Sequence, residues 1–187
     1  MSELIDQAFA KGRSGMDRAV QHLKDELLKI RTGKANPAML SGIMVDYYGN
    51  PTPLNQAANV STPDSKTIAI QPWDKSLLGA IEQAIFAANL GLTPMNDGEF
   101  VRITIPPLTE ERRKDLVKMA KALVEDTKVS IRNERHKILN TIKQEVKDGF
   151  PEDQGKRREG KVQDMINEYA DTLGKLLEAK EKDIMTV

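Results

Sequence analysis

A stretch of 39 residues, from 109 to 147, contains neither glycine nor proline, and it limits the folds open to this chain. Pro106 and Pro107 prevent a helix from running in from upstream, and Thr109 is a favourable N-cap residue. An Asp-Gly pair follows the stretch and is a typical stop. Such a helix would be about 58 Å long at ~1.5 Å per residue. Because a helix of that length needs partners along its surface, the rest of the chain must supply them.

Two further segments repeat apolar residues at helical spacing. Residues 4–31 do so through Phe9, Met16, Val20, Leu23, Leu27 and Ile30. Beyond Pro151 the same helical spacing continues through Val162, Ile166, Tyr169, Leu173, Leu176 and Ile184. Gly12 and Gly15 weaken the first helix, and we expect them to let a neighbouring helix pack closely. The predicted fold class is α+β, an antiparallel three-helix bundle interrupted by a small inserted domain.

The inserted part differs in composition from the rest. Of the 28 basic and 28 acidic residues only 10 fall within residues 32–106, which hold 7 of the 9 prolines. Alternating apolar residues predict strands at 43–48, 67–71 and 100–105, a turn at 49–53, and a short amphipathic helix at 74–89. Aromatic residues at strand spacing are more often core than contact residues, which favours a core role for the aromatic residues Tyr47, Tyr48 and Trp73. Because neighbouring residues of a strand point to opposite faces, we expect one of the two tyrosines to be exposed.

These patterns predict two domains joined by two linkers. Residues 1–31 with 107–187 form the bundle, and residues 32–106 form the β-rich insertion. Two closely placed linkers allow a hinge. The hinge residues that we predict are Thr32, Gly33, Ile105, Pro106 and Pro107.

The totals exclude several classes of protein. Basic and acidic residues balance, at 28 each, so the chain is not a generic polycation. It has no cysteine, which excludes disulfides and thiolate metal sites and fits a reducing cytoplasm. Its start lacks a basic region followed by an apolar run, and no stretch approaches ~18 apolar residues. We expect a cytoplasmic protein that does not associate with membranes.

Residues that usually carry catalysis are scattered. His22 and His136 fall on different predicted helices, with no cysteine to share a metal. Residues 155–161 follow the spacing of a phosphate-binding loop, but Val162 stands where Mg²⁺ needs a hydroxyl. We interpret that segment as a polar loop leading into the third helix. We therefore expect no metal, no cofactor and no enzymatic activity.

Basic residues recur on one face of the predicted helix at 109–147. They are Lys114, Lys118, Lys121, Lys128, Arg132 and Arg135, and we call them the basic stripe. A charge run is often only a solvated face. Here, however, residues 128–137 gather four cations around Glu134, and arginine can grip phosphate with two hydrogen bonds. No aromatic residues interleave, so we expect recognition of the backbone and shape of structured RNA rather than base stacking.

Four segments, in order, resemble the ribosome recycling factor family over essentially the whole chain. They are Lys-Ile-Arg-Thr-Gly-Lys-Ala-Asn-Pro at 29–37, Asp-Tyr-Tyr-Gly-Asn-Pro-Thr-Pro-Leu at 46–54, Pro-Pro-Leu-Thr-Glu-Glu-Arg-Arg-Lys-Asp-Leu at 106–116, and Ile-Arg-Asn-Glu-Arg at 131–135. The resemblance implies a two-domain, L-shaped protein that is similar to transfer RNA in outline. Its bundle would lie on ribosomal RNA of the large subunit, and its smaller domain would move about a hinge.

The resemblance also implies a function and residues that perform it. With elongation factor G and GTP, such factors split the post-termination ribosome into subunits for reuse. Family arginines matching Arg31, Arg132 and Arg135 are implicated in ribosome contact, and we add Lys128 from the basic stripe. Lys34 stands where arginine is common in the family, and His136 replaces an arginine that often follows position 135. Both departures keep some basic character.

Two other classes of function remain open at this point. A coiled-coil adaptor would use its helices for protein partners and leave the basic stripe solvated. It predicts a surplus apolar seam and self-association, whereas a closed bundle would be a monomer. An enzyme rests only on the incomplete phosphate-loop match. We favour a monomeric recycling factor whose partners are the large ribosomal subunit and elongation factor G.

Overall fold

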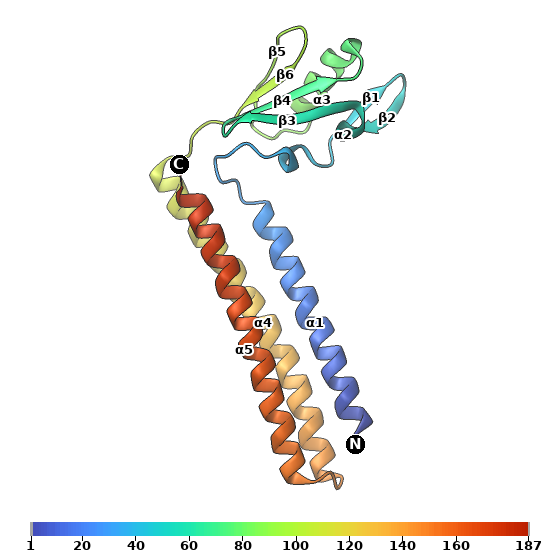
Figure 1. The fold of residues 1–187 in the computed structure, drawn as a ribbon, viewed down its shortest axis with the longest axis vertical. Coiled ribbons are helices and arrows are strands. Elements are labelled where there is room, and N and C mark those ends of the chain that lie inside the picture. Colours follow the sequence, from blue (N-terminus) through green and yellow to red (C-terminus); the bar gives the residue numbers. More distant parts are fainter. Residues whose placement is uncertain (1, 187) are drawn as a thin grey trace. The chain divides into compact units, whose positions relative to one another are not determined.

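The computed structural model describes residues 2–186 (Figure 1). The chain divides into two compact units, Met1–Arg31 with Glu110–Val187, and Thr32–Thr109. The first unit is a bundle of long helices, and the second combines antiparallel strands with short helices. The α+β class and the interrupted three-helix bundle are thereby confirmed. The L-shaped outline stays a prediction.

Three helices build the bundle, and they lie side by side along their length (Figure 1). They are α1 (Glu3–Leu28), α4 (Glu110–Lys147) and α5 (Glu152–Met185). Each is antiparallel to the helix that follows it in the bundle, as their short or inserted connections require. Their shared core includes Ile5, Met16, Leu23, Leu116, Ala120, Val124, Ile131, Ile138, Ile142, Val162, Met165, Leu173 and Ile184.

The boundaries of α4 agree with the stop and start signals in the sequence. The helix begins at Glu110, directly after Thr109. At its other end Gly149 has a φ of 108°, a conformation that glycine adopts without strain. The amide of Phe150 then donates to the carbonyl of Glu145 at 2.9 Å, and the amide of Gly149 donates to Val146 at 3.2 Å. This pair of bonds is a Schellman motif, and it turns the chain into α5.

Glycines let the helices approach one another closely, as we expected for α1. A Cβ on Gly12 would lie 2.4 Å from Ile138 Cδ1, and one on Gly15 would lie 2.6 Å from Glu134 Cδ, both on α4. A Cβ on Gly155 of α5 would lie 2.7 Å from Val146 Cγ2. Segment 155–161 lies inside helix α5, so our interpretation of it as a loop is wrong. Because Gly155 packs against α4 inside a regular helix, the segment has no phosphate-binding loop geometry.

Two glycines of α5 give a matched test of this packing. Gly160 has open space around its missing Cβ, so Gly160→Ala should raise the free energy of unfolding by about 0.5–1 kcal/mol through helix propensity. Gly155→Ala should instead lower it by about 1–2 kcal/mol, because a new methyl would overlap the stiff side chain of Val146. Urea unfolding followed by circular dichroism measures both. Equal effects at the two sites would contradict the packing.

Tyr169 of α5 connects that helix to α1 from within the core. Its ring is buried, and its hydroxyl donates to the carboxylate of Asp17, with the carbonyl of Arg13 at 3.4 Å. Burial, together with the hydrogen bond to Asp17, raises the pKa of Tyr169 to about 12. The neutral hydroxyl is thus favoured in the folded state over the unfolded state, where tyrosine titrates near its ordinary pKa of about 10.

This shift predicts how stability depends on alkaline pH. At pH 8, Tyr169→Phe should lower the free energy of unfolding by about 1–2 kcal/mol through loss of the hydrogen bond. The contribution of Tyr169 is complete below pH ~10 and is lost as the pH rises towards the folded pKa of about 12. The difference in melting temperature between the native chain and Tyr169→Phe should therefore shrink between pH 9 and pH 11.5. A constant difference would contradict the assigned environment.

The unit Thr32–Thr109 contains a four-stranded antiparallel sheet in the order β3-β4-β6-β5 and a separate hairpin, β1-β2. The strands are β1 (Met44–Tyr47), β2 (Asn50–Pro53), β3 (Ala58–Asp64), β4 (Thr67–Pro72), β5 (Pro94–Asn96) and β6 (Val101–Thr104). The helices are α2 (Leu54–Ala57), α3 (Leu78–Ala87) and the 3₁₀ turns Pro37–Leu40 and Lys75–Leu77. Ile68, Ile70, Ile81, Ile85, Val101 and Ile103 form the centre of its own core.

The sequence located three of these strands, at β1, β4 and β6, and missed β2, β3 and β5. The segment 49–53 was predicted as a turn, but only Tyr48 and Gly49 turn, and Asn50–Pro53 is strand β2. Tyr48 and Gly49 have φ values of 49° and 85°. Positive φ at both central residues is the type I′ hairpin turn, so the strand resumes immediately after them.

Three aromatic residues of this unit, Tyr47, Tyr48 and Trp73, are not core residues. Tyr47 is 36% exposed, Tyr48 72% and Trp73 70%. One exposed tyrosine was expected, but the prediction of a core role for the other tyrosine and for Trp73 is wrong. Tyr48 lies in the turn rather than in the strand, and its ring meets that of Tyr47 edge to face instead of pointing to the opposite side. Aliphatic residues, among them Val45, Leu54 and Ile70, fill the core in their place.

Candidate nucleic-acid interface

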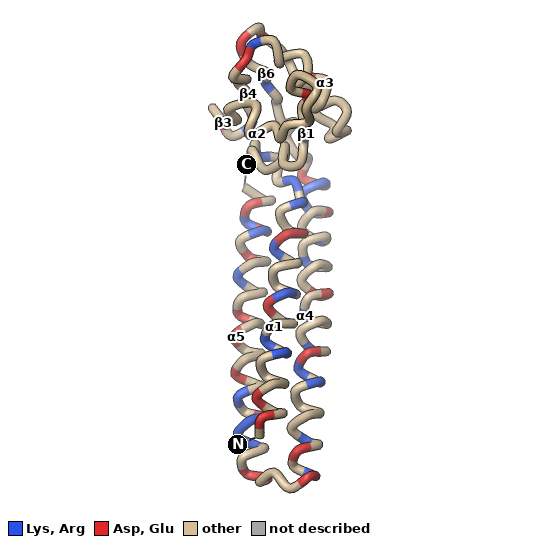
Figure 2. Tube along the Cα trace, turned by 90° about the vertical axis from the view of Figure 1, so that its right-hand side faces the viewer, with Lys and Arg blue, Asp and Glu red and all other residues tan. Residues whose placement is uncertain are grey.

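The basic stripe follows the flank of α4 that adjoins α5. Lys121 Nζ lies 3.8 Å from Glu181 Oε1 of α5, which fixes the side of α4 on which the stripe runs. Lys128 and Arg132 recur from there at helical spacing and are exposed, while Arg135 is half-buried. Figure 2 shows the Lys and Arg positions along α4. The stripe is therefore a continuous flank of the bundle and not a random scatter of charges.

Neutralisation divides the stripe into paired and unpaired cations. Lys114 lies 3.5 Å from Glu110, Lys121 3.8 Å from Glu181, and Lys128 3.0 Å from Glu125. Within residues 2–186, by contrast, no carboxylate lies within ion-pair distance of Lys118, Arg132 or Arg135. The two arginines keep their full positive charge available for an anion that is not part of this chain.

The surroundings of the two arginines differ from each other. Arg132 Nε donates weakly to the carbonyl of Lys128 at 3.5 Å, and its side chain is exposed. Arg135 Nε is buried and has no hydrogen-bond partner within the described residues. Burying a donor without a partner costs free energy. Because the guanidinium is partly removed from water, a hydrogen bond between it and an anion is stronger than one formed in water. Arg135 is thus the less hydrated of the two cations.

The sequence of α5 explains why these arginines have no partner. Glu181 shares its flank of α5 with Gly174, Ala170, Asn167 and Gln163, at steps of seven, four, three and four residues. None of these four carries a charge, and Gln163 donates to Asn167 at 2.9 Å. Lys121 contacts Glu181 and Val146 contacts Gly155, which fixes the register of the antiparallel helices α4 and α5. In that register Arg132 lies opposite Ala170. The adjoining helix therefore presents small and amide side chains there, which do not neutralise the arginines.

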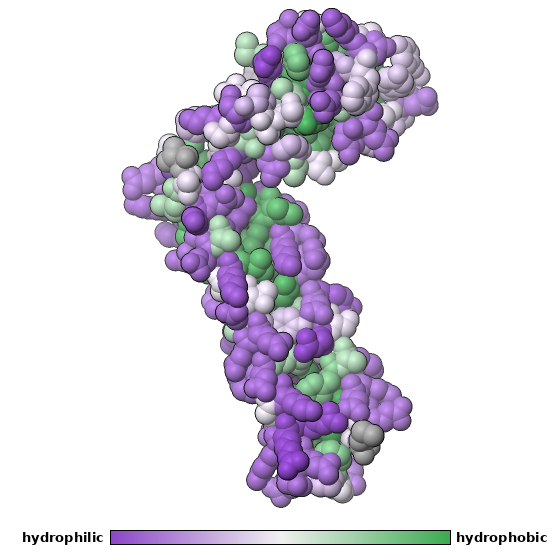
Figure 3. Space-filling model, viewed as in Figure 1, coloured by the Kyte–Doolittle hydropathy of each residue, from purple (hydrophilic) through white to green (hydrophobic). Residues whose placement is uncertain are grey.

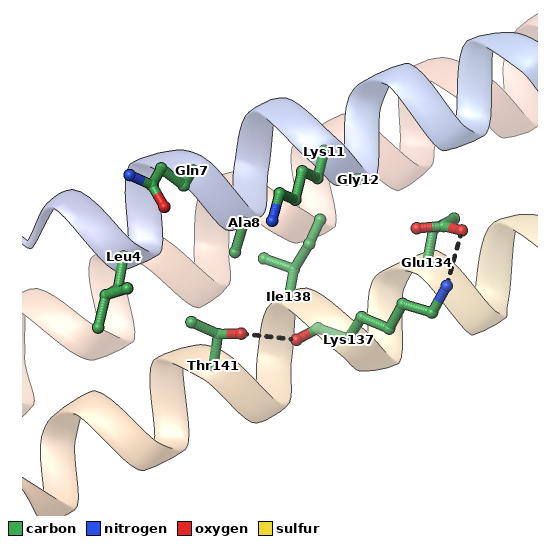
Figure 4. A pocket seen from close by; sticks show the side chains of 9 residues that line it. All are labelled: Leu4, Gln7, Ala8, Lys11, Gly12, Glu134, Lys137, Ile138 and Thr141. Carbon is green, nitrogen blue, oxygen red and sulfur yellow. Dashed lines mark hydrogen bonds and ion pairs between the residues drawn. The ribbon is translucent and has the colours of Figure 1, made fainter.

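The remaining cations of the segment 128–137 do not all share this flank. Lys137 Nζ lies 3.1 Å from Glu134 Oε1, and both residues line a groove between α4 and α1 (Figure 4). Glu134 reaches that side because Gly15 of α1 has no Cβ to exclude its carboxylate. Lys11 of α1 lines the same groove. The four cations that the sequence grouped around Glu134 thus divide between two flanks of α4, with Lys128, Arg132 and Arg135 together.

Arg31 lies away from this cluster. It follows the last turn of α1, where Lys29 is paired with Glu26 at 2.7 Å, and it is exposed. Gly12 packs on Ile138 and Gly15 on Glu134, so Leu28, the last residue of α1, is level with Lys121 of α4, and Arg31 follows beyond the end of the helix. The 11 residues from Lys121 to Arg132 correspond to ~17 Å of helix. Arg31 and the Arg132–Arg135 pair would therefore touch different parts of one large ligand.

The residues predicted as a hinge lie in different environments. Gly33 has a φ of 74°, and a Cβ there would lie 3.1 Å from Leu108 Cγ. Ile105 is buried in the core of its unit, and its amide donates to the carbonyl of Lys66 at 2.7 Å. Pro106 and Pro107 are exposed, and Thr32 is half-buried. Ile105 is thus fixed to the sheet, while the prolines after it are not.

Chemistry other than binding has little support in the fold. His22 lies on α1 and His136 on α4, and within residues 2–186 no three His, Cys, Asp or Glu side chains gather as metal ligands would. In the same range, no helix is long and apolar enough to cross a lipid bilayer. The best candidate for a binding site is the flank of α4 that carries Arg132 and Arg135, which form no ion pair within the described residues.

Comparison with known proteins identifies the family. A model of the ribosome recycling factor family matches residues 23–185. The chain belongs to the ribosome recycling factor family. The recycling factor of Porphyromonas gingivalis is 49% identical over 184 residues, which cover 98% of this chain and 99% of the relative. The similarity therefore spans both units of the chain and not only one of them.

Solved structures of the family agree with the fold. A solution structure of a ribosome recycling factor matches with a TM-score of 0.81 and 38% identity, covering 100% of both chains. A second match has a TM-score of 0.64 and 42% identity, covering 97% of this chain and 99% of the other. It is described as models for the T. thermophilus ribosome recycling factor and the E. coli elongation factor G bound to the E. coli post-termination complex.

The two departures from the family pattern lie outside the unpaired pair of arginines. His136 is exposed, and it follows Arg135 on the helix at an angle that turns it further towards solvent. Lys34 is half-buried in the unit Thr32–Thr109 and has an interaction partner within the chain. Neither substitution removes a cation from the flank that carries Arg132 and Arg135.

Proposed function

We propose that this chain is a ribosome recycling factor of the cytoplasm that binds the post-termination ribosome through large-subunit ribosomal RNA. With elongation factor G and GTP, it then splits the ribosome into subunits for another round of translation. One observation carries the proposal: within residues 2–186, Arg132 and Arg135 form no ion pair on one flank of the bundle, in a chain whose residues 23–185 match the family model. Phosphates of structured RNA are the anions that complement two adjacent arginines.

The proposed contact has a graded set of contributors. Arg132 and Arg135 would bind RNA phosphates directly, because no carboxylate within residues 2–186 competes for them. Lys128 would contribute less, since Glu125 holds its ammonium at 3.0 Å and both side chains are exposed. Arg31 would bind a separate stretch of backbone. The uncharged flank of α5 beside Arg132 lets the RNA approach without repulsion.

The second part of the proposal is a hinge. We propose that the unit Thr32–Thr109 swings when elongation factor G pushes on it, through dihedral changes at Thr32, Gly33, Pro106 and Pro107. Ile105, which we also predicted as a hinge residue, is held by its core contacts and by the hydrogen bond to the carbonyl of Lys66. We therefore propose that Ile105 moves with the smaller unit and that the hinge begins after it. The GTPase supplies the free energy, and this chain acts as a wedge without a reaction centre.

The adaptor alternative depends on apolar surface that the bundle leaves uncovered. The seams of α1, α4 and α5 are largely buried in one core. On the face drawn in Figure 3, apolar side chains gather between α1 and α5, where Leu27, Leu28 and Leu176 line a groove. A single groove of this kind does not make the continuous seam that a coiled-coil adaptor requires.

Light scattering tests the proposed function directly. Purified 70S ribosomes carrying deacylated transfer RNA should lose scattering intensity when this chain, elongation factor G and GTP are added together, and should keep it when any one is omitted. A chain that binds ribosomes yet never splits them under these conditions would contradict the proposal. Sedimentation equilibrium distinguishes the adaptor, which would self-associate, from the monomer that we propose.

A further inference from the structure

Tyr47, Tyr48 and Trp73 are exposed aromatic residues of the smaller unit that the proposed RNA contact does not use, and a hydrogen bond places Tyr48 beside the Trp73–Asp74 segment. We call Tyr47, Tyr48 and Trp73 the aromatic patch. The chain has only 4 Phe, 3 Tyr and 1 Trp, and these three rings are between 36% and 72% exposed. Exposed Tyr and Trp side chains are costly to leave in water and are enriched where proteins bind other proteins. Their exposure therefore indicates a binding surface.

Hydrogen bonds hold the rings of the patch in place. Tyr47 and Tyr48 meet edge to face with centroids 4.8 Å apart. Tyr48 Oη donates to Asp74 Oδ2 at 2.6 Å, and Trp73 Nε1 donates to the carbonyl of Gln56 at 3.0 Å. Asp74, which follows Trp73 in the chain, thus connects the two halves of the patch. Rings that are already ordered lose little conformational entropy on binding, as in a pre-organised binding surface.

The charges around the patch select a cationic ligand. Residues 32–109 contain six acidic and four basic residues, and Asp46 and Asp74 adjoin the tyrosines in sequence or by hydrogen bond. Hydrogen bonds from Tyr48 and Ser76 hold the pKa of the Asp74 carboxyl below its usual value, so it stays ionised. Lys75, the neighbouring cation, lies 3.8 Å from Glu99. Phosphate is repelled from such a surface, whereas a cation gains from both the carboxylates and the ring faces.

The same unit already contains this mode of recognition. The guanidinium of Arg102 lies over the ring of Phe100, 4.9 Å from its centroid, and its Nε lies 2.9 Å from Asp97 Oδ2. One aromatic face and one carboxylate thus hold an arginine at the surface. The aromatic patch offers the same two components, with its carboxylates at Asp46 and Asp74, and no cation of the chain occupies it within the described residues.

We propose that the aromatic patch is a docking surface for an arginine- or lysine-bearing segment of a protein partner. The cation would lie over the face of Tyr47 or Trp73, with Asp46 and Asp74 providing the countercharge. This contact is independent of RNA binding by α4. It gives the smaller unit a protein partner of basic chemistry, and it leaves the phosphate contacts to the bundle.

Trp73 is the only tryptophan of the chain, so its fluorescence reports on the patch alone. The full-length protein is titrated with a hexa-arginine peptide, with a hexa-glutamate peptide and with a twelve-nucleotide oligouridylate. The arginine peptide should change Trp73 emission in a saturable way, and the other two probes should not. A response to oligouridylate instead would overturn the proposal in favour of RNA. An emission change on raising the protein concentration alone would overturn it in favour of a second copy of the chain.

Variants separate a specific contact from general attraction to a negative unit. Asp46→Asn with Asp74→Asn keeps an acceptor oxygen for the backbone amides of Gly49 and Ser76 and removes both charges. At position 74 the amide nitrogen replaces the oxygen that accepts from Tyr48, so it would donate to Tyr48 Oη instead. This variant should weaken peptide binding roughly tenfold. Tyr47→Ala should weaken it several-fold. Asp64→Asn with Glu82→Gln makes the same change of net charge elsewhere in the unit, and it should bind as the native chain does. Equal peptide binding by all variants would contradict the proposal.

Discussion

Replacing Arg132 and Arg135 with glutamate is expected to lower the affinity for large ribosomal subunits by roughly 100-fold or more. Each substitution removes an arginine that forms no ion pair within residues 2–186 and places an acid against RNA phosphates. The loss of one phosphate contact is worth about 1.4 kcal/mol or more, which is tenfold in affinity, and repulsion adds to it. Neither side chain belongs to the fully buried core, so circular dichroism should show a folded bundle.

The measurement is cosedimentation with purified large subunits over a series of salt concentrations. For a surface that neutralises Z phosphates, the logarithm of the binding constant falls with the logarithm of salt at a slope of about −0.7Z to −0.9Z on simple nucleic acids. The double variant should show both weaker binding and a shallower slope. Binding as tight as that of the native chain would mean that the arginine flank is only solvated and that the assigned site is wrong.

A control with the same change of net charge is available on α5. Lys156 lies 3.6 Å from Glu152 and Lys175 lies 3.0 Å from Asp171, and all four side chains are exposed. Lys156→Glu with Lys175→Glu should change binding by no more than a few-fold. If this control lost as much affinity as the arginine variant, long-range charge rather than a local contact would explain the binding.

The bundle could be predicted from sequence because its signals are local and repeated. The interval 109–147 has no residue that breaks a helix, and apolar residues recur at one spacing over α1, α4 and α5. The smaller unit was harder. Strands β2 and β3 contain prolines at Pro51, Pro53 and Pro63, which argue against a strand when read alone. Short or edge strands tolerate them, but only the pairing partner reveals this.

The candidate site was predictable in its residues and not in its arrangement. The spacing of Lys128, Arg132 and Arg135 places them on one face of a helix, and this holds in the bundle. Which of them is neutralised depends on Glu125, which pairs with Lys128, and on the uncharged flank of α5 beside the arginines, which lies far away in sequence. Exposure of one of the two tyrosines was expected from their adjacency, but the place of Tyr48 in the turn was not, because a type I′ turn with a tyrosine at positive φ is unusual for a residue with a Cβ.

Removing the smaller unit is expected to separate binding from splitting. Residues 1–31 joined to 110–187 through a short glycine-serine linker retain the whole core of α1, α4 and α5. The core of the smaller unit is made only of its own residues, so the bundle does not depend on it. The end of α1 and the start of α4 lie at the same end of an antiparallel pair, within reach of such a linker. The shortened chain should therefore fold as a helical bundle.

The shortened chain should bind large subunits within roughly threefold of the full chain, because the unpaired arginines remain and their contacts carry the affinity. Splitting of post-termination ribosomes with elongation factor G and GTP should fall to the rate without any factor, because the GTPase no longer has a unit to push. Light scattering measures splitting, and cosedimentation measures binding on the same preparation. If the shortened chain split ribosomes at the native rate, the bundle alone would be the working part and the proposed hinge would have no role. If it failed to bind although folded, the smaller unit would carry affinity that we have assigned to α4.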